Sequence, residues 1–434
     1  MRRVAVVGSG IAGLSVAHGL AAEARVTLFE AGTHFGGHAH TVDITVDGIT
    51  HGVDTGFLVL NERTYPHLLA LLARLEVPIA ASEMSFSVQA DAGLEWSGSN
   101  LDGVFAQRGN LLRPRFWAML RDILRFNRRC TALALAGSDA ALDASIGDFL
   151  DREGYSVAFR DWYLLPMIGC IWSCPTDQML RFPIATLIRF CHNHGLLQIS
   201  DRPQWYTVAG GSRRYVERML AVIPDARLST PVRQVRRVPA DSADAGVWVA
   251  TDHGSERYDE VVFACHTDQA LHLLETPTRS ERAVLGAIRY QPNRALLHTD
   301  ASLLPKRRRA WSAWNYQRGA AADGDGAAVC LHYWLNRLQP LPFSTPVIVS
   351  LNPLVAPRDA TIHGEFDYEH PVFDRAAIAA QQRLPEIQGS AHTWFCGAWT
   401  RYGFHEDGLV SGLAVNIGLR NAWAAADAGR RVAA

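Results

Sequence analysis

The chain has 434 residues, of which 48% are hydrophobic and 9% aromatic, a composition typical of a folded globular protein with room for two or three lobes. A formal net charge of −1 at pH 7 gives no reason to expect binding to nucleic acid. No run approaches the roughly 18 apolar residues of a membrane-spanning helix, and the apolar run at the N-terminus is assigned to a strand rather than to a signal peptide. We therefore expect a cytoplasmic protein.

The first forty residues carry the strongest pattern in the chain. Arg3–Val7 predicts a short buried strand, and Ile11–Ala22 predicts a helix. Between and within them, Gly8, Gly10 and Gly13 form a G-x-G-x-x-G motif. These glycines allow a tight turn, close approach of the backbone to a pyrophosphate, and close packing of the helix on the strand. The pyrophosphate would lie at the positively polarised N-terminus of the helix.

A second predicted strand, Arg25–Phe29, is followed by Glu30, at about the 20-residue distance where an acid binds a ribose hydroxyl. An acid at this point favours an adenosine without a 2′-phosphate, which means FAD or NAD rather than NADP. The glycine pair Gly36-Gly37, shortly after Glu30, favours FAD.

Two further runs follow, GGHAHTVDI at 36–44 and VDTGFLVLNERTYPHL at 53–68. With them, the chain resembles the flavin-containing amine oxidase superfamily, which includes monoamine and polyamine oxidases, protoporphyrinogen oxidase and phytoene desaturase. More closely, it resembles a bacterial branch of FAD-binding oxidoreductases that is associated with cyclopropane-type fatty acid methyltransferases. The resemblance implies bound FAD and makes a methyltransferase a candidate partner. His38, His40 and Cys396 are conceivable points of covalent attachment, but no attachment residue is evident, and we expect noncovalent FAD.

The resemblance also implies an α/β fold, in which a Rossmann-type FAD-binding lobe is interleaved with a mixed α/β substrate lobe. We expect residues 1–80, 205–275 and 390–434 to form the discontinuous FAD-binding domain. Residues 81–204 and 276–389 are expected to form the substrate-binding domain.

Other predicted elements support this division of the chain. A hairpin is expected to turn at Asp47-Gly48, and Ser145 with Asp148 forms a capping box that opens a helix. Further helices are expected at 65–75, 116–136 and 213–220, and further strands at 84–88, 94–96, 232–238, 247–251 and 261–264.

The second strong motif is FCGAWTRYGFHEDGLVSGLAVNIGL, Phe395 to Leu419. It resembles the closing segment of the superfamily, where a Gly-acid pair meets the ribityl chain and a helix caps the pyrimidine end of the flavin. Gly397 matches, whereas Ala398 stands where the acid is usual, so that contact is lost or supplied by another group. The helix is expected from Leu409 onward.

These motifs give the expected cofactor-binding residues. Gly8, Gly10, Gly13 and Glu30 are expected at the ADP half of FAD, and Gly36, Gly37, Gly56 and Gly397 along the rest. The full set comprises Gly8, Gly10, Ile11, Ala12, Gly13, Glu30, Ala31, Gly36, Gly37, His38, Gly56, Val232, Gly397, Gly408, Leu409 and Ser411. His38 replaces the arginine that is usual in the superfamily, which removes the expected cationic contact to the cofactor.

The flavin supplies the redox chemistry, and the protein orients the substrate and excludes water. Tyr402, His405 and Glu406 are the candidate catalytic residues, since the C-terminal motif should bring them to the pocket; a packed loop beside the ring is the competing interpretation. Glu406 and Asp407 could accept a proton, but their place just before a helix favours capping.

The preferred function is hydride transfer from a lipid acyl chain to flavin N5. Lys306 is the one lysine of the chain and lies in a solvated basic run, which disfavours fast amine oxidation because several amine-oxidising relatives use a buried lysine near the flavin. Two alternatives remain open: amine oxidation, and a non-redox flavoprotein such as an isomerase or a lipid-binding partner of a methyltransferase.

Two basic stretches, 113–133 and 306–314, combine arginines with large apolar residues. Each one alone is explained by a solvated basic face over a buried apolar face. Together they support the hypothesis of peripheral contact with anionic lipid at the inner membrane face.

The chain has seven cysteines, an odd number that fits reduced thiols. Five residues could in principle bind zinc: Cys170, Cys174, Cys191, His192 and His194. Their spacing departs from familiar zinc patterns, and core thiols are favoured. No metal site is predicted.

Overall fold

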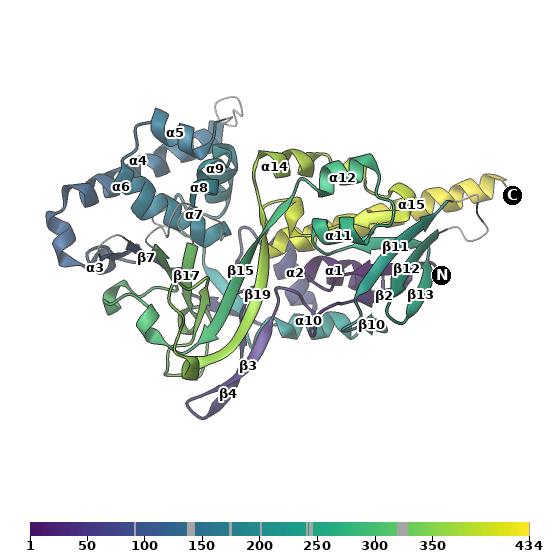
Figure 1. The fold of residues 1–434 in the computed structure, drawn as a ribbon, viewed down its shortest axis with the longest axis horizontal. Helices are drawn as coiled ribbons and strands as arrows, with labels where there is room; N and C mark the ends of the chain where they lie inside the picture. The colour runs from purple at the N-terminus through teal and green to yellow at the C-terminus, as the bar shows by residue number, and fades with distance from the viewer. Residues whose placement is uncertain are drawn as a thin grey trace.

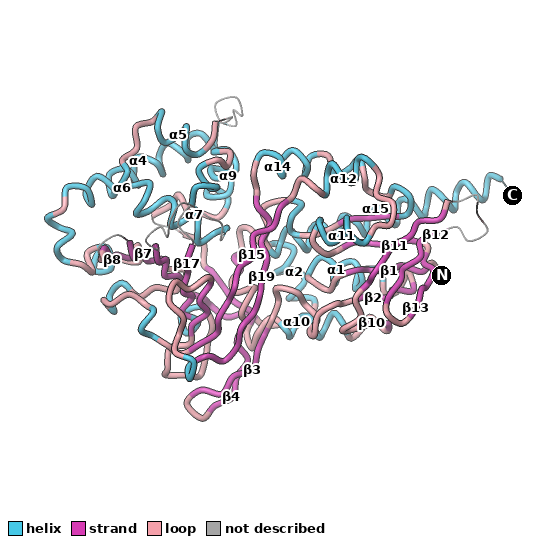
Figure 2. Tube along the Cα trace, viewed as in Figure 1, coloured by secondary structure: helices cyan, strands magenta, loops and turns pink. Residues whose placement is uncertain are grey.

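The computed structural model describes residues 1–90, 93–136, 144–172, 176–199, 202–239, 242, 246–318 and 329–433. The molecule is elongated, with both termini at one end and a group of helices at the other (Figure 1). Strands lie in the middle of the molecule and at the end that holds the termini, as Figure 2 shows. No described helix combines the length and the hydropathy needed to cross a bilayer.

The end that holds the termini is built on a five-stranded parallel sheet in the order β10-β2-β1-β14-β20. Its strands come from three separated parts of the sequence: β1 (Arg3–Val7), β2 (Arg25–Phe29), β10 (Asp225–Arg227), β14 (Glu260–Phe263) and β20 (Thr393–Phe395). β1 and β2 are almost fully buried, as expected for apolar strands of a parallel sheet covered on its faces. The helices of this end are α1 (Ile11–Leu20), α2 (Pro66–Arg74), α10 (Arg213–Leu220), α11 (Thr267–Leu273), α12 (Arg279–Leu285), α14 (Arg375–Gln382) and α15 (His405–Ala433).

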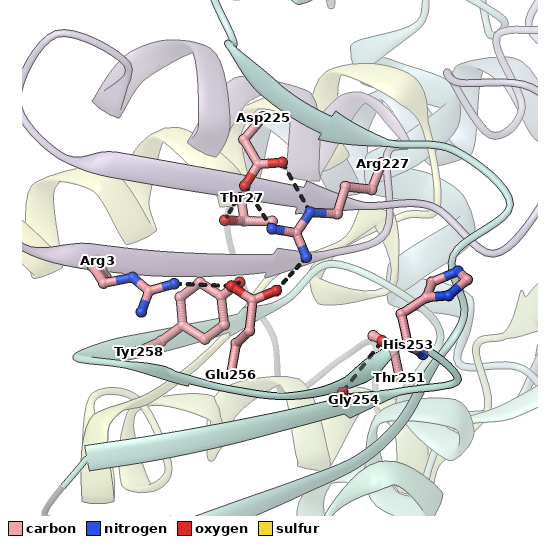
Figure 3. Close-up of polar contacts among 9 residues, drawn as sticks. All are labelled: Arg3, Thr27, Asp225, Arg227, Thr251, His253, Gly254, Glu256 and Tyr258. Atoms are coloured by element: carbon pink, nitrogen blue, oxygen red, sulfur yellow. Dashed lines mark hydrogen bonds and ion pairs between the residues drawn. The ribbon is translucent and has the colours of Figure 1, made fainter.

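An antiparallel meander lies beside this sheet: β11 (Val232–Val238), β12 (Gly246–Thr251) and β13 (Gly254–Tyr258). Figure 3 shows the polar contacts that fasten it. Glu256 of β13 accepts a hydrogen bond from Arg3 of β1 (3.0 Å) and forms an ion pair with Arg227 of β10. Arg227 also donates to Asp225 (2.8 Å), which accepts from the hydroxyl of Thr27 in β2 (2.8 Å). The meander is thus tied to three strands of the parallel sheet.

The middle of the molecule is a seven-stranded mixed sheet in the order β19-β15-β18-β17-β16-β7-β8. Its strands are β7 (Phe86–Ala90), β8 (Leu94–Ser97), β15 (Arg289–His298), β16 (Trp314–Arg318), β17 (Val329–Trp334), β18 (Ile348–Leu351) and β19 (Ile362–Val372). Two small sheets connect the large ones: β3 (Thr41–Val46) with β4 (Ile49–Asp54), and β5 (Leu60–Asn61), β9 (Trp205–Val208) and β6 (Ile79–Ser82).

The far end is helical: α3 (Leu101–Val104), α4 (Pro114–Ala136), α5 (Ile146–Arg152), α6 (Val157–Phe159), α7 (Leu165–Trp172), α8 (Thr176–Leu180) and α9 (Ile184–Asn193), with α13 (Leu335–Leu338) beside the sheet. The predicted capping box opens α5, where the Asp148 N–H donates to the Ser145 hydroxyl (3.1 Å). The predicted Asp47-Gly48 turn also forms, since both residues have positive φ (53° and 76°), as the hairpin twist requires.

The sequence misplaced the start of the C-terminal helix. It begins at His405, four residues before the expected Leu409, so Glu406 and Asp407 lie in its first turn. The Asp407 carboxylate accepts hydrogen bonds from the N–H groups of Tyr402 (3.2 Å) and Phe404 (3.0 Å), and these contacts hold the chain in the turn that starts the helix. The strand expected at 84–88 is shifted to Phe86–Ala90.

Candidate functional site

A cavity of about 1560 Å³ runs from the parallel sheet to the helices of the far end. Single-ligand pockets hold about 300–1,000 Å³, so this cavity has space for more than one molecule of that size. Residues that directly follow strands of the parallel sheet line it: Gly8 after β1, Glu30 after β2 and Ala264 after β14. The carboxyl ends of parallel strands are where α/β proteins bind their ligands.

The G-x-G-x-x-G motif forms one wall, and its glycines are under different steric constraints. Gly8 has a φ of +104° and makes the turn, and its N–H bonds the carbonyl of Phe29 (2.9 Å). A Cβ at Gly13 would stand 1.9 Å from the carbonyl oxygen of Gly8, so the close packing of α1 on β1 requires glycine there. Gly10 is the opposite case, because a Cβ there would meet no atom within 4 Å. A larger side chain at Gly10 would occupy the space that a ligand needs.

Gly36 and Gly37 lie directly against this motif. The Gly36 N–H donates to the carbonyl of Ser9 (3.1 Å), and a Cβ at Gly37 would come within 3.1 Å of the Gly10 Cα. Glu30 accepts hydrogen bonds from the N–H groups of Ser9 (3.0 Å) and Gly32 (2.7 Å) and from the Ser9 hydroxyl (2.5 Å). A carboxylate has about four acceptor positions, so Glu30 keeps capacity for a ligand hydroxyl.

Two buried polar atoms in this wall have no partner within the described part of the chain: Nε2 of His38 and the indole Nε1 of Trp399. Both residues line the cavity. An unpaired buried polar atom costs stability, so each of these is a candidate contact for a bound ligand. Burial, reinforced by the nearby His370 and His266, holds the pKa of His38 well below its ordinary value, so the ring is neutral. His38 therefore offers a ligand no positive charge, in agreement with the loss of the cationic contact expected from the sequence.

The remaining expected cofactor residues divide into two groups. Ile11, Ala12, Gly56, Gly397 and Gly408 line the cavity together with the residues above. Gly13, Ala31, Val232, Leu409 and Ser411 do not line it.

Some of the second group support the wall from behind. The Ser411 hydroxyl accepts a hydrogen bond from the Gly397 N–H (2.9 Å), and Leu409 is packed into the core beside α1. Ala31 is exposed at the surface. Val232, the first residue of β11, is buried and packs in the same core cluster as residues of the parallel sheet.

His405 and Tyr402 line the cavity, as expected of catalytic candidates. His405 is stacked on Phe57 (ring centroids 3.9 Å apart), and its Nε2 lies 2.6 Å from the Tyr215 hydroxyl. Burial lowers the pKa of His405 to about 3, so it is neutral. Burial also raises the pKa of Tyr402, which keeps its hydroxyl protonated at neutral pH.

Glu406 is absent from the cavity wall and serves the start of α2 instead. Its carboxylate accepts hydrogen bonds from the N–H groups of His67 and Leu68 (2.9 Å each) and contacts Nδ1 of His67 (2.7 Å). It therefore caps a helix, as its position in the sequence favoured, but the capped helix is far away in the chain. Asp407 caps its own helix, and burial raises its pKa to about 6.

Helices α3, α4, α7 and α9 and strand β8 form the other part of the wall, which we call the apolar half. Its members are mostly aliphatic and aromatic: Trp96, Leu101, Phe105, Trp117, Leu120, Ile123, Leu124, Asn127, Tyr163, Met167, Ile171 and Phe190. The other part of the wall contains Gly8, Gly10, Gly36, Gly37, Gly56, Gly397 and Gly408, and we call it the glycine-lined half. In the apolar half, Asn127 Oδ1 is a buried acceptor without a partner among the described residues.

Several histidines around the glycine-lined half were not singled out from the sequence. His34 lies stacked on His40 (3.8 Å between centroids), and His370 lies 5.4 Å from His38. His266 contacts Glu369 (3.2 Å). The run HFGGHAH at 34–40 was a usable signal, whereas His266 and His370 join it only through the fold.

No group of three or more His, Cys, Asp or Glu side chains is placed to hold a metal ion in the described ranges. Cys170 and Cys191 are buried, and burial raises the pKa of each thiol, so both are core thiols. Cys174 lies outside the described residues.

Comparison with known proteins supports the fold. Residues 6–75 match a family model described as an NAD(P)-binding Rossmann-like domain. The whole chain is similar in structure to the CLA-producing fatty acid isomerase from P. acnes (TM-score 0.65, 14% identity, 97% of this chain and 98% of that chain covered). The chain shares the fold of this isomerase.

Two oxidases have the same fold. Cyclohexylamine oxidase from Brevibacterium oxydans IH-35A gives a TM-score of 0.65 at 15% identity, with 96% of this chain and 99% of that chain covered. Putrescine oxidase bound to putrescine gives 0.61 at 15% identity, with 97% and 99% covered. No curated protein sequence matches the chain. The predicted α/β fold of the amine oxidase type is thus confirmed.

Proposed function

We propose that the chain is an oxidoreductase that binds one FAD noncovalently and oxidises a lipid acyl chain. The observation that carries the proposal is the glycine-lined half of the cavity, at the carboxyl ends of the parallel strands and at the N-terminus of α1. The pyrophosphate of FAD would lie against Gly8, Gly10 and the first turn of α1, where backbone and helix dipole favour an anion. Glu30 would accept a ribose hydroxyl.

The rest of the cofactor would extend past Gly37 and Gly56 toward Gly397. His38 Nε2 and the Trp399 indole N–H, both without partners, are suited to its polar edge. Trp399 would supply the contact that Ala398 cannot make. His38 and His405 are neutral, so at these two positions the site offers hydrogen bonds rather than positive charge. When bound, FAD supplies the hydride acceptor; the residues of the chain orient the substrate and exclude water.

The apolar half would hold the substrate. Its aliphatic and aromatic lining is suited to an acyl chain, and Asn127 Oδ1 is placed to accept a hydrogen bond from a polar group of the substrate. The one lysine of the chain, Lys306, is exposed and does not line the cavity. This disfavours amine oxidation of the kind that depends on a buried lysine.

We also infer that the FAD-binding lobe comprises 1–80, 205–275 and 390–434, and the substrate lobe 81–204 and 276–389. The three parts of the sequence that contribute strands to the parallel sheet all fall within the first set. The methyltransferase association stays a prediction.

The test is an anaerobic titration of the FAD-loaded protein, during which the visible absorption spectrum of the flavin is recorded. Bacterial phospholipids, including cyclopropanated ones, and their free fatty acids are added in parallel with a panel of amines. We expect bleaching with an acyl substrate and none with amines. Bleaching by amines alone would replace the proposal with amine oxidation.

Isomerisation of a fatty acid is the second candidate. It is favoured by the shared fold with a CLA-producing fatty acid isomerase and by the apolar half of the cavity. This candidate predicts a product of unchanged mass with moved double bonds, and no net bleaching. Mass spectrometry and double-bond mapping of the lipids after incubation separate the two.

A further inference from the structure

Helix α4 carries an unusual row of exposed side chains. Trp117, Arg121, Leu124, Arg128 and Leu135 follow a spacing of three, four or seven residues, so they form one stripe along the helix. The three apolar members are 50%, 51% and 74% exposed, respectively. Large apolar side chains that alternate with arginines on a solvent-facing stripe contribute nothing to the core. This pattern is typical of a helix face that meets a lipid surface.

The stripe is continued by the segment before α4. Leu101, Leu111 and Leu112 are 78%, 46% and 88% exposed. The Trp117 indole N–H donates to the carbonyl of Leu111 (2.9 Å), so this segment lies against the start of the stripe. Together these residues form a patch that is apolar over two separate pieces of chain.

Basic residues accompany the patch. Residues 101–136 contain seven arginines and two aspartates, and one of these, Asp122, is buried. All seven arginines are exposed. The second basic stretch joins them, because Arg309 (Nε to carboxylate, 3.4 Å) and Arg108 both pair with Asp102. The stretch at 306–314, far apart in the sequence, thus lies beside residues 102–108, in the segment that precedes α4.

The cavity reaches this surface. Leu101, Trp117 and Leu124 are exposed and also line the apolar half. Figure 1 shows α3 and α4 at the end of the molecule opposite both termini and the parallel sheet. A chain-like substrate that enters between these residues reaches the apolar half without crossing the glycine-lined half.

We propose that the patch formed by Leu101, Leu111, Leu112, Trp117, Leu124 and the arginines around them docks on an anionic lipid bilayer. The leucines and Trp117 enter the headgroup region, and Arg121 and Arg128 pair with lipid phosphates. An acyl chain then passes from the bilayer into the cavity between Leu101, Trp117 and Leu124. The route of the acyl chain rests on the proposed function, whereas docking itself does not.

The test is flotation of the FAD-loaded protein with vesicles rich in phosphatidylglycerol, compared with vesicles of phosphatidylcholine alone. We expect binding to the first that weakens at high salt, because lipid charge acts through a screened field. The double variant Arg121→Glu/Arg128→Glu should bind at least about 30-fold more weakly, since each basic residue near an anionic surface contributes about a factor of five and the added carboxylates are repelled by it. Leu112→Glu, at a position outside the cavity wall, should also weaken binding, because it places a charge where an apolar side chain enters the headgroup region.

Matched controls separate this surface from general charge effects. Arg25→Glu/Arg218→Glu makes the same change of net charge on exposed residues of the parallel-sheet end, and Val355→Glu changes another exposed apolar residue (63%). Both should bind as the unmodified protein does, and far-ultraviolet circular dichroism checks that every variant is folded. Docking is overturned if the unmodified protein does not float with anionic vesicles, or if the control variants lose as much vesicle binding as the patch variants.

The same set distinguishes docking from the proposed function. Patch variants should still oxidise an acyl substrate presented as detergent-dispersed monomer. If vesicle binding holds and no acyl substrate bleaches the flavin, the docking proposal survives and the proposed oxidation fails.

Discussion

The two halves of the cavity differ in what lines them: main chain in one half and side chains in the other. The glycine-lined half presents main chain. Hydrogen bonds hold it in place, such as those from the Gly36 N–H to the Ser9 carbonyl and from the Gly397 N–H to the Ser411 hydroxyl. The apolar half presents side chains from α3, α4, α7 and α9. A wall of main chain fixes the position of one ligand and tolerates little change. A wall of side chains sets the size and shape of the other ligand and can be altered residue by residue.

The largest effect is expected at Gly10. Its φ of −60° suits any residue and its Cβ position is open, so Gly10→Val should leave the fold intact and fill the cofactor space. FAD affinity should fall by more than about 100-fold, as measured by flavin retained after gel filtration and by titration. Gly109→Val, at another open glycine outside the cavity, should keep its flavin. Full flavin occupancy in Gly10→Val would sink the assignment of this half.

A smaller and more selective effect is expected in the apolar half. Ile123→Trp adds bulk to its wall and should leave FAD bound. For long acyl substrates kcat/KM should fall roughly tenfold, equivalent to about 1.4 kcal/mol of transition-state stabilisation. Val157→Trp, at an exposed position (65%), is the control. Unchanged turnover of long substrates would mean that the acyl chain lies elsewhere.

The neutral histidines predict a pH effect on stability. The pKa of His405 is lowered to about 3 and that of His370 to about 4, chiefly by burial. The unfolded chain therefore binds protons at these groups below about pH 6.5, whereas the folded chain does not, so the free energy of unfolding falls as the pH is lowered from 6.5 toward 4. Asp54 and Asp407, whose pKa values burial raises to about 6, act in the opposite direction over part of this range.

His405→Gln isolates one histidine, because glutamine can still bond the Tyr215 hydroxyl. Its slope of unfolding free energy against pH should differ from that of the unmodified protein by up to about 1.4 kcal/mol per pH unit. Denaturant unfolding at several pH values between 4 and 6.5 gives both slopes. Parallel slopes would show that His405 titrates normally in the folded protein.

The smallest effect is expected at the side-chain contacts of Figure 3, whose residues do not line the cavity. The Glu256 side chain is 39% exposed, so its pairs with Arg3 and Arg227 are screened by water. Glu256→Gln should lower the free energy of unfolding by about 0.5–1 kcal/mol and leave FAD affinity unchanged. Glu217→Gln, on the exposed side of α10, should change neither the free energy of unfolding nor the FAD affinity. A loss of FAD in Glu256→Gln would show that the meander shapes the cofactor half.

The sequence predicted local structure well where one short segment determines it. Arg3–Val7, Arg25–Phe29 and Val232–Val238 are strands with the predicted ends, because apolar pattern and neighbouring turns define them. The start of α15 was missed, since the Asp407 carboxylate turns back to the Phe404 N–H and allows the helix to begin a turn earlier.

The candidate site shows the same limit. The glycines were located because their roles depend on neighbours within a few residues. Glu406 was assigned to the pocket, yet it caps α2, more than three hundred residues earlier in the chain. His266 and His370 were not singled out as contacts, because only the packing of β14 and β19 brings them to the cavity.

The most direct test of the central claim is the identity and amount of cofactor in the purified protein. The chain is purified with FAD present, freed of excess, and denatured without protease; the released flavin is then quantified by chromatography and mass spectrometry. We predict one FAD per chain, released intact, which also establishes that it is noncovalent. A protein that stays colourless and binds no added FAD would contradict the account.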